Sequence, residues 1–326
     1  MIDSEVIVVG GGPAGSACAR ELVRNNIETV VLEKAEAESP GGKICAGWIT
    51  PQVLRDLGLR PKEYPHSLLT FNRLHYRIRR KRFSVMTRQY SIRRCEFDPW
   101  LLVRAGAPVH RHAVSRIREE DGRYIIDDLF RAKYLVGAGG TDCPVYRTLF
   151  AKVNPRAREL RIIGMDEEFP YEYRNKNCYL WFFDRDLPGY SWYVPKGNGY
   201  LNIGLGGKFA ALKGGNETLR DHWDYFIQKL DGLSLVKNHA SHPRGRNYYL
   251  RHGVDAGRLG NAFITGDAAG LATVDMGEGI GPAVESGILA AESIIHGIPY
   301  SLKSVTKYSW PGILFPWWNR RFGRGR

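Results

Sequence analysis

Three glycines near the start of the chain have the spacing of a dinucleotide-binding turn. Gly10, Gly12 and Gly15 follow the apolar, β-branched run 5–9 and open the small-residue segment 14–23. Such a turn ends a strand, brings the backbone close to a pyrophosphate and points free helix N–H groups at its charge. Glu33 ends the next apolar run, where a carboxylate accepts a hydrogen bond from an adenosine ribose. The sequence therefore predicts a dinucleotide-binding βαβ unit over residues 5–33.

A second glycine-bearing turn lies near the other end of the chain. Gly266 and Asp267 follow the apolar run 262–265, and a loop at 277–281 precedes the small, apolar segment 282–295. A carboxylate beside small residues at a strand end suits the hydroxyls of a flavin ribityl chain. The loop opens a predicted helix, whose N–H groups and positive dipole end can hold an isoalloxazine carbonyl. Gly266 and Asp267 alone also fit a helix-capping turn, but the two turns together favour a flavin dinucleotide.

The segments between these turns predict a second, β-rich layer. Alternation at 73–80 and 81–87 indicates a basic strand pair, and Asn198-Gly199 indicates a hairpin. Asp98 before Pro99 is a plausible N-cap for a helix that starts near Phe97. The other predicted strands are 109–113, 114–119, 123–127, 134–140, 162–169, 177–183, 190–195 and 200–205, and the other predicted helices are 50–57 and 219–230.

The positive charge of the chain is confined to two places. The 326 residues carry a formal charge of +13, but Arg73 to Arg94 holds nine basic and no acidic residues. The sequence after Glu292 holds six more basic residues and no carboxylate, which leaves 32 basic against 34 acidic residues elsewhere. Such segments suit an anionic membrane surface or an anionic partner, or form an ordinary solvated basic strand pair. No zinc spacing or RNA-binding signature accompanies them, so no nucleic acid partner is expected.

The remaining composition bears on location and metals. The five cysteines form no CxxC pair, and no apolar run is long enough to span a membrane. Both features indicate a cytoplasmic protein, which could also bind to a membrane surface. The aromatic tail 308–318, followed by four arginines, suits either a bilayer interface or packing against its own domain. The histidines lack ligand spacing, so no metal site is expected.

With these motifs in place, the chain resembles the flavoprotein hydroxylase superfamily, and within it the geranylgeranyl reductase family. The residues that carry the resemblance extend to about Pro299 and comprise Gly10 to Gly15, Glu33, Lys43 to Gly47, Arg94 with Phe97-Asp98, Gly137 to Arg147, Pro188 to Pro195, Gly266-Asp267 and Gly277 to Gly281. The chain departs from the pattern at Gly139, where an aspartate is usual, and at Ala46, where a glycine is frequent. It also ends soon after the last helix, where the family continues into a helical region.

The resemblance implies FAD as cofactor and assigns roles to individual residues. Cys45 would stand near the flavin as a proton donor or redox thiol, although a buried cysteine can also be a simple filler. Tyr190 and Trp192, two apart on one strand, would line an apolar substrate pocket, although the same spacing fits a sheet core. The implied cofactor-binding residues are Gly10, Gly12, Pro13, Ala14, Gly15, Glu33, Lys34, Lys43, Ala46, Gly47, Arg94, Val114, Ala138, Gly139, Gly266, Asp267, Gly277, Gly279 and Ile280.

These observations predict an α/β fold, in which a Rossmann-like FAD/NAD(P)-binding domain is interleaved with an antiparallel β-sheet substrate domain. The expected ranges are 1–70, 95–155 and 255–300 for the FAD-binding domain, 71–94 and 156–254 for the substrate domain, and 301–326 for a basic aromatic tail. The expected activity is reduction of C=C bonds in an apolar, isoprenoid-type substrate. NAD(P)H or a protein donor would supply electrons, since no second glycine-rich dinucleotide motif occurs. The alternatives are an FAD monooxygenase or halogenase and a flavin electron carrier that docks to a membrane or redox partner; the oligomeric state is left open.

Overall fold

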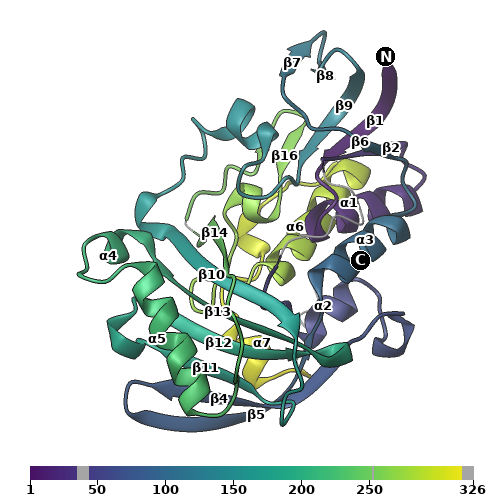
Figure 1. Ribbon diagram of the computed structural model, residues 1–326. Helices are drawn as coiled ribbons and strands as arrows, with labels where there is room; N and C mark the ends of the chain where they lie inside the picture. The colour runs from purple at the N-terminus through teal and green to yellow at the C-terminus, as the bar shows by residue number, and fades with distance from the viewer. Residues whose placement is uncertain (35–43, 252, 318–326) are drawn as a thin grey trace.

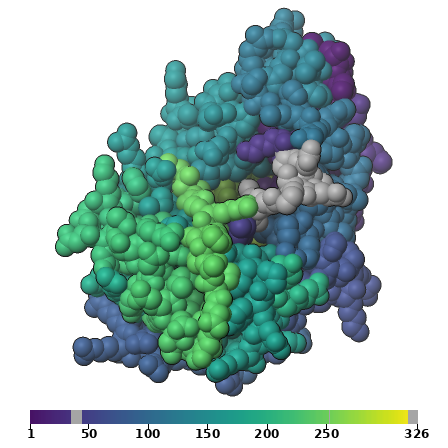
Figure 2. Space-filling view, viewed as in Figure 1, coloured from purple at the N-terminus to yellow at the C-terminus, as the bar shows by residue number. Residues whose placement is uncertain are grey.

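The fold is built on two eight-stranded sheets, which lie in two lobes of the molecule (Figures 1 and 2). The computed structural model describes residues 1–34, 44–251 and 253–317. In the first sheet the strand order is β15-β16-β9-β1-β2-β6, with the β7-β8 hairpin joined to β9. Its strands are β1 (Ile2–Val9), β2 (Thr29–Glu33), β6 (Val109–Arg111), β7 (Ile117–Glu120), β8 (Arg123–Ile126), β9 (Phe130–Gly137), β15 (Arg258–Leu259) and β16 (Ala262–Ile264).

The centre of this sheet is parallel and apolar. β1 pairs in parallel with β2 and β9, and β9 pairs in parallel with β16. The carboxyl ends of strands from both ends of the sequence therefore meet at one edge of the sheet, which is where α/β folds bind ligands. Val6, Ile7 and Val8 of β1 are completely buried, as expected for a strand that is covered on both faces.

The second sheet has the order β14-β10-β13-β12-β11-β4-β5-β3. It is antiparallel except where β11 runs parallel to β4. β3 lies within the range expected for the first domain, yet it pairs with β5 and so extends the second sheet. The strands are β3 (Trp48–Ile49), β4 (Leu69–Ile78), β5 (Lys81–Ser91), β10 (Arg161–Pro170), β11 (Cys178–Phe182), β12 (Gly189–Lys196), β13 (Tyr200–Lys208) and β14 (Arg244–Tyr249).

Two features of this sheet follow from local sequence. Asn198 and Gly199 both have positive φ, 56° and 69°, in the turn that joins β12 to β13. This confirms the predicted hairpin, because asparagine and glycine tolerate that conformation best. β4 and β5 confirm the predicted basic strand pair, although β5 extends to Ser91 because its second half is buried.

The helices connect and cover the sheets. They are α1 (Pro13–Arg24), α2 (Pro51–Asp56), α3 (Arg94–Ala105), α4 (Phe209–Lys213), α5 (Leu219–Gly232), α6 (Ile280–His296) and α7 (Trp310–Leu314). α1 and α6 pack closely, since a Cβ on Gly287 would overlap the carbonyl oxygen of Ala14. α5 packs Trp223 and Phe226 against one face of the second sheet (Figure 1). No helix within the described residues is long and apolar enough to span a bilayer.

The predicted N-cap at Asp98 is wrong, because α3 begins four residues earlier, at Arg94. Asp98 lies inside the helix, where its carboxylate accepts hydrogen bonds from Nε (2.6 Å) and Nη2 (2.5 Å) of Arg94. This bidentate pair joins positions i and i+4, and Phe97 between them is 1% exposed. Tertiary burial and the ion pair thus set the start of the helix, rather than the local capping signal.

Candidate functional site

The first glycine turn has the shape that a dinucleotide requires. Gly10 has φ of +109°, and a Cβ there would lie 2.5 Å from the carbonyl oxygen of Ala138. A Cβ on Gly15 would overlap the carbonyl oxygen of Gly10, so α1 can approach β1 only without a side chain there. A Cβ on Gly12 would meet nothing within 4 Å, so this backbone faces open space. Open space at a helix N-terminus is where a pyrophosphate fits.

Glu33 stands beside this turn, at the end of β2. Its Oε2 accepts a hydrogen bond of 2.5 Å from the N–H of Gly11. This contact fixes a carboxylate next to the glycine turn, at the position where a carboxylate in dinucleotide-binding folds accepts a hydrogen bond from a ribose hydroxyl. Lys34 follows with an exposed side chain, Val114 packs partly buried against the core of the first sheet, and Lys43 lies outside the described residues.

The turn from the other end of the chain meets the first one. Gly266 has φ of +54°, and a Cβ there would lie 3.4 Å from Cβ of Ala14 in α1. The side chain of Asp267 lies near Gly279, because its Oδ1 is 3.4 Å from the position of a Cβ on that glycine. Gly139, beside Ala138, packs against Cys143, because a Cβ on this glycine would lie 3.2 Å from the Cα of Cys143. The two glycine turns are therefore parts of one site.

The N-terminus of α6 completes this site. Within the described residues, the N–H groups of Gly279 and Ile280 have no protein acceptor. Glu278 beside them is half-buried; desolvation raises its pKa to about 8, and its Oε1 accepts a 2.5 Å hydrogen bond from the N–H of Gly281. A neutral carboxyl does not oppose a nearby anion, and free N–H groups attract one. Together with the open space at Gly12, these groups fit the two halves of FAD.

A buried lysine holds the loop that carries Cys45. Lys196, at the end of β12, is 0% exposed, and burial lowers its pKa to about 8. Its Nζ donates hydrogen bonds to the carbonyl oxygens of Ala46, of Ile92 (2.7 Å) and of Cys45 (3.3 Å). Gly47 has φ of +55° and leaves room for the ammonium group, which a Cβ there would overlap. Lys196 was not among the site residues expected from the sequence, although it directly follows the predicted strand 190–195.

The charges around Cys45 favour its thiolate. Burial raises the pKa of the thiol, but the guanidinium groups of Arg246 and Arg94, the backbone N–H of Gly47 and the ammonium group of Lys196 together outweigh burial, so the pKa lies below the usual value. Arg246 projects from β14, where Asp166 accepts a 3.0 Å hydrogen bond from its Nε. Arg246 was also missed by sequence reasoning. Cys45 is therefore a more acidic thiol than an ordinary cysteine.

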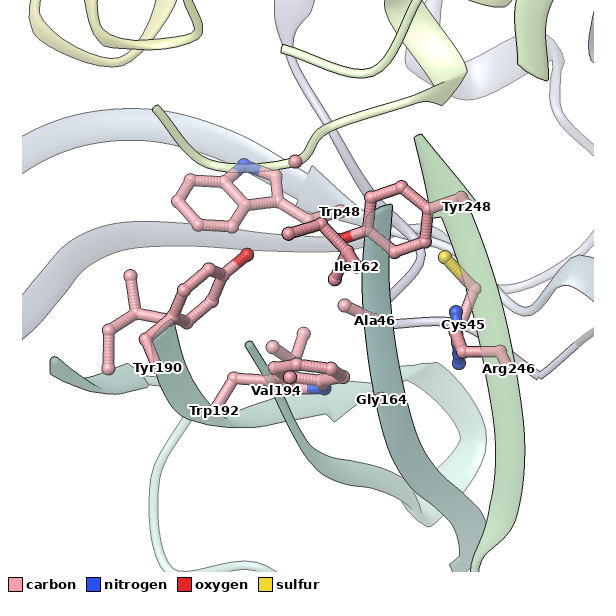
Figure 3. Close-up of a pocket in the computed structure, with 13 residues that line it drawn as sticks. Cys45, Ala46, Trp48, Ile162, Gly164, Tyr190, Trp192, Val194, Arg246 and Tyr248 are labelled. Carbon is pink, nitrogen blue, oxygen red and sulfur yellow. The ribbon is translucent and has the colours of Figure 1, made fainter. Parts of the chain in front are cut away.

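Beside Cys45 lies an apolar cavity of about 80 Å³ (Figure 3). In Figure 3 the rings of Trp48 and Tyr190 lie on the left side of the cavity, and Cys45, Arg246 and Tyr248 lie on its right side. Trp192 lies between the two groups. The Tyr190 hydroxyl donates a 2.5 Å hydrogen bond to the carbonyl of Met276, and Trp192 Nε1 donates one of 2.7 Å to Asn202. Because these polar atoms are satisfied, both side chains present aromatic faces to the cavity.

Comparisons with known proteins agree with this geometry. A family model described as FAD dependent oxidoreductase matches residues 5–100. Digeranylgeranylglycerophospholipid reductase 2 of Methanosphaera stadtmanae is 28% identical over 94% of this chain and 82% of its own length. The menaquinone reductase of Mycolicibacterium smegmatis is 28% identical over 99% of this chain and 83% of its own length.

Solved structures share the fold. A geranylgeranyl bacteriochlorophyll reductase-like protein from Thermoplasma acidophilum superposes with a TM-score of 0.80 at 22% identity, over 91% of this chain and 79% of the other. The flavin-dependent brominase Bmp2 superposes with a TM-score of 0.72 at 17% identity, over 91% of this chain and 81% of the other.

Proposed function

Because this chain belongs to the geranylgeranyl reductase family of FAD-dependent oxidoreductases, we propose that it reduces carbon–carbon double bonds in an isoprenoid-type substrate. The observation that carries the proposal is the apolar, aromatic cavity that ends at the Cys45 thiol. The relatives that support it are named as reductases of an isoprenoid lipid and of menaquinone. The substrate class is therefore a prenyl chain on either a lipid or a quinone.

The two glycine turns would hold the cofactor. The ADP half would bind Gly10, Gly12, Pro13, Ala14, Gly15, Glu33 and Lys34, with Val114, Ala138 and Gly139 alongside; the flavin half would bind Ala46, Gly47, Arg94, Gly266, Asp267, Gly277, Gly279 and Ile280. When bound and reduced, FAD supplies a hydride to an alkene carbon.

The protein itself would supply the proton and exclude water. Cys45 Sγ would donate its proton to the second alkene carbon and would afterwards regain one from solvent, which balances the addition of two hydrogens. A general acid works best when its pKa approaches the operating pH, and the cations beside Cys45 lower its pKa in that direction. Tyr190 and Trp192 would position the chain. NAD(P)H or a protein donor would return electrons to the flavin.

An anaerobic half-reaction tests this function. The purified flavoprotein is reduced with dithionite under nitrogen and mixed with geranylgeranyl lipids or menaquinones. We expect the flavin absorbance to return without oxygen and the product to gain two hydrogens by mass spectrometry. Menaquinone products are re-oxidised in air before the mass is measured, so that hydrogens added to the quinone ring are not counted as reduction of a double bond. If the flavin stays reduced until oxygen is added, and product forms only then, the proposal is wrong and a monooxygenase or halogenase activity takes its place.

We also propose that the end of the described chain contacts an anionic membrane. Leu314, Phe315 and Trp317 are 41%, 45% and 74% exposed within four residues. No carboxylate follows Glu292, whereas six basic residues do. Exposed aromatic and apolar side chains beside cations suit a bilayer interface with anionic lipids.

Vesicle sedimentation checks this contact. The protein should sediment with phosphatidylserine-containing vesicles but not with pure phosphatidylcholine, and about 1 M salt should release it, because the Debye length then falls to about 3 Å. Trp317→Ala should weaken sedimentation several-fold. Val103→Ala removes a side chain that is 78% exposed on α3 and should have no effect. Equal sedimentation of wild type and Trp317→Ala would contradict the proposed contact.

A further inference from the structure

A second cavity, here called the outer cavity, lies on the other face of the second sheet. Its volume is about 390 Å³, compared with about 80 Å³ for the cavity beside Cys45. Tyr179 and Trp181 of β11 line it, whereas Leu180 between them packs into the apolar cluster that contains Trp192. Successive side chains of a strand point to opposite faces of the sheet. The second sheet therefore separates the two cavities, and a molecule in the outer cavity would not reach the catalytic site.

Six of the side chains that line the outer cavity come from three neighbouring strands, β11, β4 and β5, at the lower end of the molecule in Figure 1. The strand register places them in two rows across the sheet, with Tyr179, His75 and Ser84 in one row and Trp181, Arg77 and Arg82 in the other. Leu233 and Leu235, from the segment after α5, add an apolar wall. Among the described residues that line the cavity there are two arginines and no carboxylate.

The two arginines lie opposite each other without a compensating acid. Arg77 and Arg82 are register partners on β4 and β5, and in the part of the chain that the structure describes neither forms an ion pair with a carboxylate. Like charges directly opposite each other on paired strands are destabilising. Lys229 of α5 is a third cation nearby: burial lowers the pKa of its ammonium group, the ion pair with Asp184 raises it, and the charges of Arg77 and Arg82 lower it again. An anion bound between the two arginines would relieve their repulsion.

The donors of these arginines suit a phosphate group. Arg77 uses Nε for the carbonyl oxygen of Arg79 (3.2 Å), but its Nη groups and the whole Arg82 guanidinium have no protein acceptor within the described residues. A guanidinium presents a planar fork of N–H donors that matches phosphate oxygens. A phosphate monoester has three terminal oxygens and carries up to two negative charges near neutral pH, so it can accept hydrogen bonds from both forks at once.

The remainder of the outer cavity suits an aliphatic chain better than a planar base. The Tyr179 ring already stacks on His75, with 4.7 Å between ring centroids, and on Trp181, with 6.0 Å. Lys229 Nζ lies 5.3 Å from the centroid of the Trp181 ring. Because these rings already pack against protein groups, a ligand would meet their edges and the two leucine side chains of the apolar wall.

We propose that the outer cavity is an accessory binding site for an amphiphilic phosphate monoester. The phosphate group would lie between Arg77 and Arg82, and the aliphatic chain would lie against Tyr179 and Leu235. The inference does not depend on the reductase activity proposed above, because the site lies on the opposite face of the sheet from Cys45. A bound ligand would stabilise the β4–β5 pair without contacting the flavin.

Calorimetric titration of the purified flavoprotein tests the ligand class. Octyl phosphate, inorganic phosphate and AMP are compared, since octyl phosphate alone combines a phosphate with an aliphatic chain. We expect octyl phosphate to bind at least about tenfold more tightly than the other two, because part of its chain leaves water. The absorbance spectrum of the oxidised flavin should stay unchanged during the titration. Equal affinity for AMP or inorganic phosphate would overturn the proposed ligand class, and a perturbed flavin spectrum would place the ligand beside Cys45 instead.

Two arginine variants separate the site from the general positive charge of β5. Arg82→Gln should weaken octyl phosphate binding by at least about tenfold, through loss of hydrogen bonds to a charged group. Arg88→Gln removes the same charge from an exposed arginine of β5 that does not line the cavity, and it should change the affinity by less than about twofold. Equal weakening in both variants would overturn the proposal, because it would show only nonspecific attraction to a basic surface.

Thermal unfolding of the ligand-free protein provides a second measurement on the same variants. Arg82→Gln should unfold at the same temperature as the wild type or at a higher one, because the substitution removes a repulsion across the strand pair. Octyl phosphate should raise the unfolding temperature of the wild type and of Arg88→Gln but not that of Arg82→Gln. A lower unfolding temperature for ligand-free Arg82→Gln would show that Arg82 serves the fold rather than a ligand.

Discussion

Gly12→Ala is expected to lower FAD affinity by at least about tenfold while leaving the stability of the cofactor-free protein unchanged. The Gly12 backbone is already in an ordinary extended conformation, and the new Cβ would have nothing within 4 Å in the protein. The methyl group would instead occupy the space next to the helix N-terminus where the pyrophosphate is proposed to bind. Loss of one close hydrogen bond from a charged group there costs about 1.5 to 3 kcal/mol. Flavin titration and thermal unfolding of the apoprotein measure the two quantities.

Gly15→Ala is the control for this prediction. Its Cβ would overlap the Gly10 carbonyl oxygen, so the apoprotein itself should be destabilised. If Gly12→Ala lowers FAD affinity alone and Gly15→Ala lowers the stability of the apoprotein, then Gly12 contacts the ligand and Gly15 serves helix–strand packing. An apoprotein that binds FAD with unchanged affinity after Gly12→Ala would place the pyrophosphate elsewhere.

The elements nearest to the site were predictable from sequence because their signals are local. Gly10 and Gly15 are required by a turn within one βαβ unit, and Asn198-Gly199 fixes a hairpin through its own backbone preference. The capping signal at Asp98 is equally local, but it was outweighed by the tertiary burial of Phe97 together with the ion pair between Asp98 and Arg94. Local patterns thus predicted elements well and failed where a tertiary contact competed with them.

The site residues that sequence reasoning missed act over long separations. Lys196 lies 151 residues from Cys45, whose carbonyl it binds, and Arg246 reaches the thiol from the opposite edge strand of the sheet. Neither has a motif, because the function of each depends on how β12 and β14 pack against the Cys45 loop. The same applies to the tail. Its aromatic composition was compatible with a bilayer or with its own domain. The structure shows that residues 305–314 fold back, because Asp275 and Glu285 bind Ser309 and Thr306, and Gln89 and Thr87 bind the carbonyl groups of Gly312 and Ile313.

Cys45→Ala is expected to slow the hydrogen-transfer half-reaction by about 100-fold, the lower end of what a positioned general acid contributes. FAD content should not change, since Lys196 holds the Cys45 loop through backbone carbonyl groups that alanine retains. The rate of flavin re-oxidation by substrate under nitrogen gives the first quantity, and the flavin-to-protein absorbance ratio gives the second. An unchanged rate would assign the proton to water or to another acid.

The pH profile distinguishes an acid from a residue that only shapes the pocket. The protonated thiol is the active form, so the rate should be highest at low pH and decline as pH rises through the pKa of Cys45. Because Arg246 lowers that pKa, the decline should begin at lower pH than for an ordinary thiol. Arg246→Gln should move the declining limb to higher pH, and Cys45→Ala should abolish it. A limb that stays in place in both variants would show that a different group titrates, and Cys45 would then contribute packing rather than a proton.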